Sequence, residues 1–273
     1  MGVYQRSPKA YEKLRDTKDI ADVLADIGVV YFEAGECDVA LEHFEEAFDL
    51  AESIGYEVVM ANVVNNLSII SVVQGYHDRA ILHGQDCLAR YGKLRDAYGL
   101  AQAYNNLGVI YVEKRNWHDA LDCFEKGMAI SQRIENLGLV ATVYVNKADL
   151  SVRRSDFTTA SHFCEMASRL YHRLGDCRGL AEAEKILGLI ALSNGELLAA
   201  QRHLEHSLEL ITAHGDCFAS AEVYRELGSL YRKKGSRRKA LSALRTSLER
   251  FEKLGSRQRA ARVRRELTLL AKS

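Results

Sequence analysis

A forty-residue period runs through this chain and constrains its fold more than any other feature. A slot for a small residue recurs at every fortieth position, and a second slot, twelve residues further on, holds only alanine. The small-residue slot is occupied by Gly28, Ser68, Gly108, Ala148, Gly188, Gly228 and Thr268, and the alanine slot by Ala40, Ala80, Ala120, Ala160, Ala200 and Ala240. A fixed period of this size is typical of a repeat array, in which each unit stacks on its neighbours.

Each unit carries the apolar spacing of two amphipathic helices. In the first unit Leu24, Ile27 and Tyr31 recur at helical spacing. Gly35 then supplies the left-handed turn that ends a helix, and Asp38 is a good cap for the helix that follows. The small residues stand where the axes of two antiparallel helices come closest. One such pair cannot bury its apolar face alone, so the sequence predicts a stack of helix pairs.

Two sets of residues carry a resemblance to a known family. They are Leu107, Gly108, Tyr111, Ala120, Phe124 and Gly127 in one unit, and Ile27, Gly28, Tyr31, Gly35, Ala40, Phe44 and Ala47 in another. In type and spacing these residues resemble the tetratricopeptide repeat (TPR), and the match covers residues 21–260. The period is longer than the family's usual 34 residues and is similar to the long repeats of kinesin light chains, spindle-orienting scaffolds and bacterial regulators. The resemblance implies an all-α fold, a right-handed superhelical solenoid of helix hairpins.

We expect one array over residues 1–273. Repeats are predicted at 21–60, 61–100, 101–140, 141–180, 181–220 and 221–260, between a partial unit at 1–20 and a capping helix at 261–273. The partial unit is predicted because Tyr11 and Leu14 match Tyr91 and Leu94, which stand near the end of a second helix. Either the chain is a piece of a longer protein or this half unit is a cap, and we favour the first interpretation.

A row of asparagines is the main candidate for function. Asn66, Asn106 and Asn146 occupy the slot two residues before the small residue, and Asn65 and Asn105 precede the first two of them. The resemblance places these slots in an inner groove lined by the first helices. An asparagine amide carries both a donor and an acceptor, so it can pair with the C=O and N–H of a peptide backbone. The alternative is that these amides bond the backbone of the neighbouring helix.

The predicted groove becomes basic toward its C-terminal end. Asp22, Asp26 and Glu33 lie at its acidic end. The basic candidates are Arg153, Lys185, Arg225, Arg232 and Lys233. We therefore expect a protein or peptide partner that has acidic residues. Arg153 also stands four residues after Asp149, a spacing at which the two side chains can pair.

Several classes of function lack support in the sequence. It contains no nucleophile elbow, P-loop or H-E-x-x-H motif, so we predict neither an enzyme nor a cofactor. His203 and His206 could offer two ligands from one helix, but no further pair completes a metal site, and no metal is predicted. Neither a signal peptide nor a long apolar run stands in the chain, and membrane association is not predicted. The six cysteines form no C-x-x-C pair, which favours reduced thiols in the cytoplasm.

We therefore predict a cytoplasmic scaffold or sensor module that binds protein or peptide in its concave groove. One alternative is the small-molecule-sensing array of a bacterial regulator. A second is binding of nucleic acid or another acidic partner at the basic end, where residues 219–273 hold 16 Lys or Arg against 5 Asp or Glu. Nucleic acid is disfavoured because no stacking aromatics alternate with these charges. Self-association through the open half unit is a further expectation.

Overall fold

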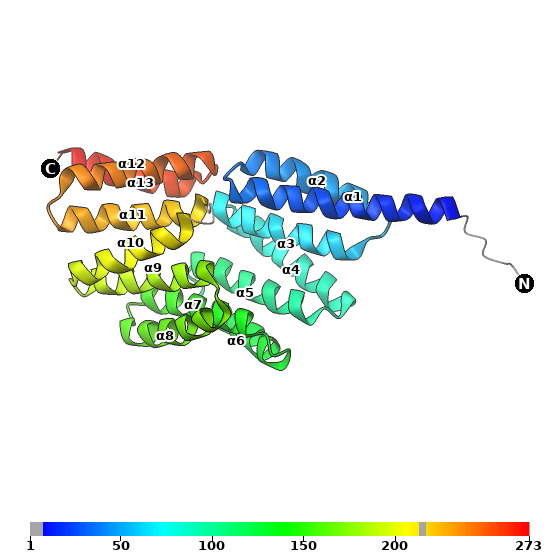
Figure 1. Ribbon diagram of the computed structural model, residues 1–273, viewed down its shortest axis with the longest axis horizontal. Coiled ribbons are helices and arrows are strands. Elements are labelled where there is room, and N and C mark those ends of the chain that lie inside the picture. The colour runs from blue at the N-terminus through cyan, green and yellow to red at the C-terminus, as the bar shows by residue number, and fades with distance from the viewer. Residues whose placement is uncertain (1–7, 213–216, 273) are drawn as a thin grey trace, which may run out of the picture.

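The computed structural model describes residues 8–212 and 217–272, and each element within these ranges is an α-helix (Figure 1). The thirteen helices are α1 (Pro8–Glu33), α2 (Cys37–Ser53), α3 (Glu57–Gln74), α4 (His77–Leu94), α5 (Ala97–Glu113), α6 (Trp117–Arg133), α7 (Leu137–Arg153), α8 (Phe157–Leu174), α9 (Cys177–Ser193), α10 (Leu197–Thr212), α11 (Cys217–Lys233), α12 (Arg237–Lys253) and α13 (Arg257–Lys272). Consecutive helices pack as hairpins, and the hairpins stack into a solenoid. The predicted all-α solenoid of helix hairpins is confirmed.

A residue of left-handed conformation separates the helices about every twenty residues. Glycine supplies this conformation near both ends of the array, for example Gly35 with φ of 83°. In the middle four other residues adopt it with φ between 54° and 61°: Arg95, Arg115, Glu135 and Ser155. The next residue is the N-cap of the following helix. Before α2 this residue is Glu36, whose side chain makes no cap bond, so the predicted cap at Asp38 is wrong. In the middle of the array the N-cap side chains do cap the helix. Asp96, for example, accepts a hydrogen bond of 3.0 Å from the backbone N–H of Gly99. Half of the forty-residue period is therefore one helix and its turn.

The small-residue slot marks the closest approach within a hairpin. A Cβ atom on Gly108 would lie 2.4 Å from the Phe124 ring, and one on Gly188 would lie 2.7 Å from Leu204. Phe124 and Leu204 are fully buried, so neither has room to move. The slot must therefore stay small for the second helix to seat against the first.

Between units, the second helix of each hairpin covers the first helix of the next. Phe44 and Ala47 of α2, for example, share a core cluster with Val63 and Ile70 of α3. This position explains the composition of α3, the one helix of the described ranges that is long and apolar enough to cross a membrane by length and composition. More than half of it, 56%, is buried inside the protein, where it contacts α1, α2, α4 and α5.

The N-terminal helix differs from the prediction for residues 8–20, and residues 1–7 of the predicted partial unit lie outside the described residues. α1 runs without a break from Pro8 to Glu33, whereas the repeat pattern predicts a unit boundary near residue 20. In the later units such a boundary is held by packing between the two helices of a hairpin. Within the described residues, the segment 8–20 folds back on no first helix of its own, and the helix continues through the boundary.

The two ends of the array touch, which the repeat pattern does not predict (Figure 1). The segment 253–259, at the turn between α12 and α13, meets residues 34–37 and 72–75; we call this the closure contact. Ser256 Oγ donates to the carbonyl of Val73 at 2.5 Å, and Lys253 Nζ donates to the carbonyl of Ala34 at 3.0 Å. The solenoid therefore completes a turn and encloses its inner groove.

Candidate ligand-binding cavity

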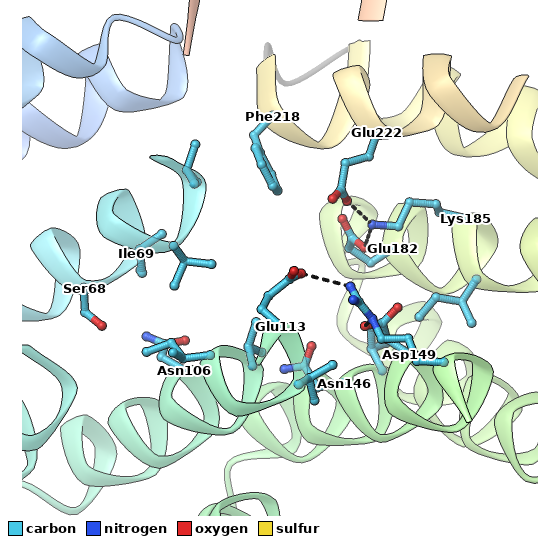
Figure 2. A pocket seen from close by; sticks show the side chains of 18 of the residues that line it. Ser68, Ile69, Asn106, Glu113, Asn146, Asp149, Glu182, Lys185, Phe218 and Glu222 are labelled. Atoms are coloured by element: carbon cyan, nitrogen blue, oxygen red, sulfur yellow. Dashed lines mark hydrogen bonds and ion pairs between the residues drawn. The ribbon is translucent and has the colours of Figure 1, made fainter. Parts of the chain in front are cut away.

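The first helices of the hairpins enclose a central cavity of about 330 Å³ (Figure 2). Its lining residues come from α1, α3, α5, α7, α9, α11 and α13, and one second helix contributes Phe124. One side of the cavity is apolar and is formed by Phe32, Ile69, Val72, Val109 and Phe218. Asparagine amides, a cluster of charged side chains and further apolar residues such as Val145 and Ile186 complete the lining. The cavity thus offers apolar, amide and ionic contacts within one space.

The asparagines form a ladder that links consecutive repeats. Asn106 Nδ2 donates to Asn65 Oδ1 at 2.9 Å, and Asn146 Nδ2 donates to Asn105 Oδ1 at 2.8 Å. Asn106 and Asn146 line the cavity, whereas Asn65 and Asn105 lie behind them. Each lining amide uses one N–H in the ladder, so its carbonyl oxygen and second N–H remain for a ligand. The ladder fixes the orientation of both amides in advance.

Asn66 belongs to the predicted row of asparagines but is not part of the ladder. It is half-buried and does not line the cavity. The ladder joins an asparagine to the residue forty-one positions earlier, and for Asn66 that residue is Ala25, which has no side-chain acceptor. At the other end the corresponding pair is Ile186 and Val145, both apolar. The alternative prediction is that the asparagine amides bond the backbone of the neighbouring helix. The structure shows Asn106 and Asn146 bonded to other side-chain amides instead.

Arg153 lines the cavity as predicted, but it is paired. Its Nε lies 2.8 Å from Asp149 Oδ2, and its Nη2 lies 2.9 Å from Glu113 Oε1. Burial alone would lower the pKa of Arg153, but the two carboxylates outweigh that effect and raise it. The guanidinium stays charged and is held in place by both carboxylates.

Lys185 also lines the cavity and is more deeply enclosed, with 12% of its side chain exposed. Its Nζ lies 2.6 Å from Glu182 Oε2 and 2.7 Å from Glu222 Oε2. Burial opposes both charges of the Lys185–Glu222 pair, but mutual attraction outweighs it, raising the pKa of Lys185 and lowering that of Glu222 to about 2. The third cation is Arg259, whose Nη2 lies 3.2 Å from Glu113 Oε1.

These pairs do not favour the predicted acidic peptide. Arg153, Lys185 and Arg259 face four lining carboxylates, so the cavity has one more negative than positive group. Each of these cations is already within ion-pair distance of a carboxylate. An acidic ligand would have to displace one of these carboxylates from its cation. The carboxylates are present because adjacent helices place acidic residues beside the basic ones.

The remaining basic candidates do not line the cavity. Arg225 Nη2 pairs with Glu226 Oε1 at 2.6 Å, and Lys233 Nζ donates to the carbonyl of Leu192 at 2.7 Å. Arg232 is exposed. At the predicted acidic end Glu33 pairs with Arg178 at 2.6 Å. The predicted gradient is therefore not laid out along one open groove.

The sequence prediction misses several cavity residues, among them Glu182, Glu222, Phe218 and Arg259. The Arg259 guanidinium lies 4.9 Å from the Phe218 ring centre, a cation–π contact. Arg259 belongs to α13, which was predicted only as a cap, and the closure contact is what brings it to the cavity. The sequence held one signal for this contact. Its N-terminal part is acidic and its C-terminal part is basic, so the two ends of the chain attract each other.

The two histidines of the predicted pair share one acidic neighbour. His203 Nδ1 lies 2.7 Å and His206 Nδ1 3.4 Å from the carboxylate of Glu184. Across the described ranges no group of three or more His, Cys, Asp or Glu is arranged to hold a metal ion.

Comparison with protein families identifies the class of this protein. Models of the tetratricopeptide repeat match residues 20–54 and 100–137 in one case and residues 179–253 in another. Together they cover more than half of the chain, which therefore belongs to the tetratricopeptide repeat family. As such it is a helical protein-interaction scaffold. No curated protein sequence matches the chain.

Solved structures share the fold at low sequence identity. A Rap protein complexed with competence and sporulation factor is 14% identical, with a TM-score of 0.68 over 98% of this chain and 81% of that one. The Rap conjugation gene regulator of the plasmid pLS20, solved with a peptide, is 16% identical, with a TM-score of 0.68 over 96% of this chain and 68% of that one. A signal-transduction ATPase from Pyrococcus horikoshii with a tetratricopeptide repeat sensor is 17% identical, with a TM-score of 0.60 over 94% of this chain. The chain spans 40% of that ATPase.

Proposed function

We propose that this protein is a scaffold or sensor module that binds a short peptide segment in its central cavity. The observation that carries the proposal is the pair of amides of Asn106 and Asn146. Each is oriented by a ladder bond and presents a free acceptor and a free donor to the cavity. A peptide backbone offers the complementary C=O and N–H groups. The Rap conjugation gene regulator of the plasmid pLS20, solved with a peptide, supports this use of the fold.

The dimensions of the cavity set the size of the segment. Its volume of about 330 Å³ lies at the lower end of the range for small-ligand sites, about 300–1,000 Å³. A few residues of a peptide fill such a space, with an apolar side chain against Ile69, Val72 and Val109. The ionic cluster lies beyond the amides and holds its own charges in pairs, so we assign it to shaping the cavity.

A pull-down with matched variants tests the proposal. The wild-type chain, an Asn106→Ala/Asn146→Ala variant and an Asn66→Ala variant are incubated with native lysate, and retained peptides and proteins are identified by mass spectrometry. Each lost hydrogen bond is worth about 0.5–1.5 kcal/mol, so the double variant should bind at least tenfold more weakly. Asn66→Ala should bind like the wild type. Equal retention by all three chains, at equal helical content, would reject the role of the ladder.

The second ladder position allows a finer test. Asn65 and Asn105 position the lining amides without reaching the cavity, so Asn105→Ala should weaken binding less than Asn146→Ala does. Equal losses would place the effect in the fold of α5 rather than in direct contact.

A small charged metabolite is the second candidate ligand, because the cavity is partly closed and holds paired charges of both signs. A thermal shift with a metabolite panel, lost in Asn106→Ala/Asn146→Ala, would favour it over a peptide.

Nucleic-acid binding is weaker as a proposal, since Lys253 and Arg259 of the basic end are engaged in the closure contact. We place the function in the cytoplasm because Cys87, Cys123 and Cys164 are buried thiols outside any disulfide.

A further inference from the structure

An apolar stripe on α1 lies open, although the array covers the same slots in every later unit. The stripe consists of Ile20, Val23 and Val30, whose exposed fractions are 52%, 54% and 64%; we call it the end stripe. The spacing of three and seven residues places these side chains on one side of the helix. None of the three lines the central cavity, so the end stripe is a surface of its own.

The six later units show what this surface is built to receive. The slots of Val23 and Val30 are buried in all of them, with exposed fractions of 7% or less. The residues are Val63, Ala103, Val143, Ala183, Val223 and Val263 in the first slot, and Ile70, Ile110, Leu150, Ile190, Leu230 and Leu270 in the second. In each case the core cluster also contains residues of the preceding second helix, such as Phe124 beside Val143 and Leu204 beside Val223. The end stripe is thus a further copy of an interface used six times.

The charge around the end stripe defines the occupant further. Asp16, Asp19 and Asp26 are exposed on the same helix. From residue 19 to its end at Glu33, α1 carries four Asp or Glu and no Lys or Arg, and its Lys18 lies over the Tyr56 ring. A second copy of this chain that paired through the same stripe would bring these like charges together, which is unfavourable. A helix with a basic border would face them with opposite charge.

We propose that the end stripe docks a basic amphipathic helix of a partner protein, which takes the place that a second helix takes in every later unit. The partner helix needs small and apolar residues at the spacing of a second helix and Lys or Arg on its flanks. The stripe from Ile20 to Val30 is about 15 Å long, about three helical turns, which matches the body of a seventeen-residue helix. The site is independent of the central cavity and would let the scaffold hold two partners at once.

The chain itself supplies matched probes. A peptide of residues 237–253, the sequence of α12, has the second-helix pattern with six Lys or Arg and two Glu. A peptide of residues 37–53, the sequence of α2, has the same pattern with six Asp or Glu and no Lys or Arg. Each is labelled with a fluorophore and titrated with the whole protein in low salt, and fluorescence anisotropy gives the affinity.

We expect the basic peptide to bind at least tenfold more tightly than the acidic one, and its affinity to fall as salt rises. Val23→Ser/Val30→Ser should reduce its affinity at least tenfold. Because both side chains are exposed, this variant is expected to keep the fold. Leu198→Ser, which changes an exposed apolar residue on α10, should leave the affinity unchanged.

Three outcomes would overturn the proposal. Equal binding of the basic peptide to the wild type and to Val23→Ser/Val30→Ser would place its site elsewhere, including its own slot between α11 and α13. Equal binding of the two peptides would remove the role of the acidic border. Dimerisation of the wild type in sedimentation velocity, abolished in the same variant, would show that a second copy of the chain covers the end stripe.

Discussion

Replacing Arg259 by alanine should release the contact between the two ends of the array. The guanidinium of Arg259 joins both sides of this contact. Its Nη1 donates to the carbonyls of Val72 and Val73 at 3.3 and 3.5 Å, and its Nη2 pairs with Glu113 at 3.2 Å. It also stacks 4.9 Å from the ring centre of Phe218. No other residue in the described ranges links the α3 carbonyls, the cavity carboxylates and α11 in this way.

The magnitude follows from these contacts. A hydrogen bond to a charged group contributes about 1.5–3 kcal/mol, and a cation–π contact about 0.5–2 kcal/mol. The side chain of Arg259 is 19% exposed, so solvent screening is partial and the lower half of this sum applies. We expect the closed form to lose about 2–3 kcal/mol relative to an open form. The population of the open form should then rise by about 30- to 150-fold.

Hydrogen–deuterium exchange measures this opening directly. Faster exchange is expected at the C-terminal end of α3, in residues 71–76, and in the turn at residues 253–257. Arg250→Ala is the matched control, because Arg250 lies 5.1 Å from the Tyr224 ring and contacts Ser220, all within α11 and α12. If Arg259→Ala left exchange in both segments unchanged, Arg259 would not hold the ends together. If Arg250→Ala accelerated the same segments equally, the effect would be a general loss of stability.

Three further predictions address packing, thiol reactivity and pH. In urea unfolding, Gly108→Ala should destabilise the protein by about 1–2 kcal/mol, because overpacking against Phe124 outweighs the gain in helix propensity. Gly92→Ala should stabilise the protein by up to about 1 kcal/mol, because its new methyl group meets open space. Stability changes of the same sign in the two variants would contradict this prediction. Thiol labelling at pH 8 with mass spectrometry should mark exposed Cys177 in the folded protein and Cys87 only after unfolding, because burial raises the pKa of Cys87 to about 12. Burial opposes the charge of Glu222, but cationic neighbours lower its pKa to about 2, so its contribution to stability is present above pH 4.5 and lost as pH falls toward 2. Glu222→Gln should flatten acid unfolding over that range, and an unchanged slope would refute the pairing.

The features that sequence predicts correctly here are those set by neighbouring residues. The left-handed turn at Gly35 and the close approach at Gly108 follow from local spacing, and both are confirmed. Asn106, Asn146 and Ile186 reach the cavity from the same slot of three consecutive units, whereas Asn66 in that slot does not. The structure shows Asn106 and Asn146 paired with the side-chain amides of Asn65 and Asn105. This pairing could not be predicted, because it depends on how far one repeat is displaced relative to the next. The position of Arg259 at the cavity cannot be predicted from local spacing, because it depends on the small rotations between units added over six interfaces.

The closure contact has a consequence for the length of the array. An open solenoid can gain or lose units while its ends stay free, since each unit depends only on its neighbours. Here one unit more or less would move Ser256 and Arg259 away from the carbonyls at the end of α3 and leave the cavity without part of its wall. The number of repeats therefore determines the shape of the cavity. Duplication or deletion of a forty-residue unit, a change that an open array tolerates, would here remove the chamber that the closed turn creates.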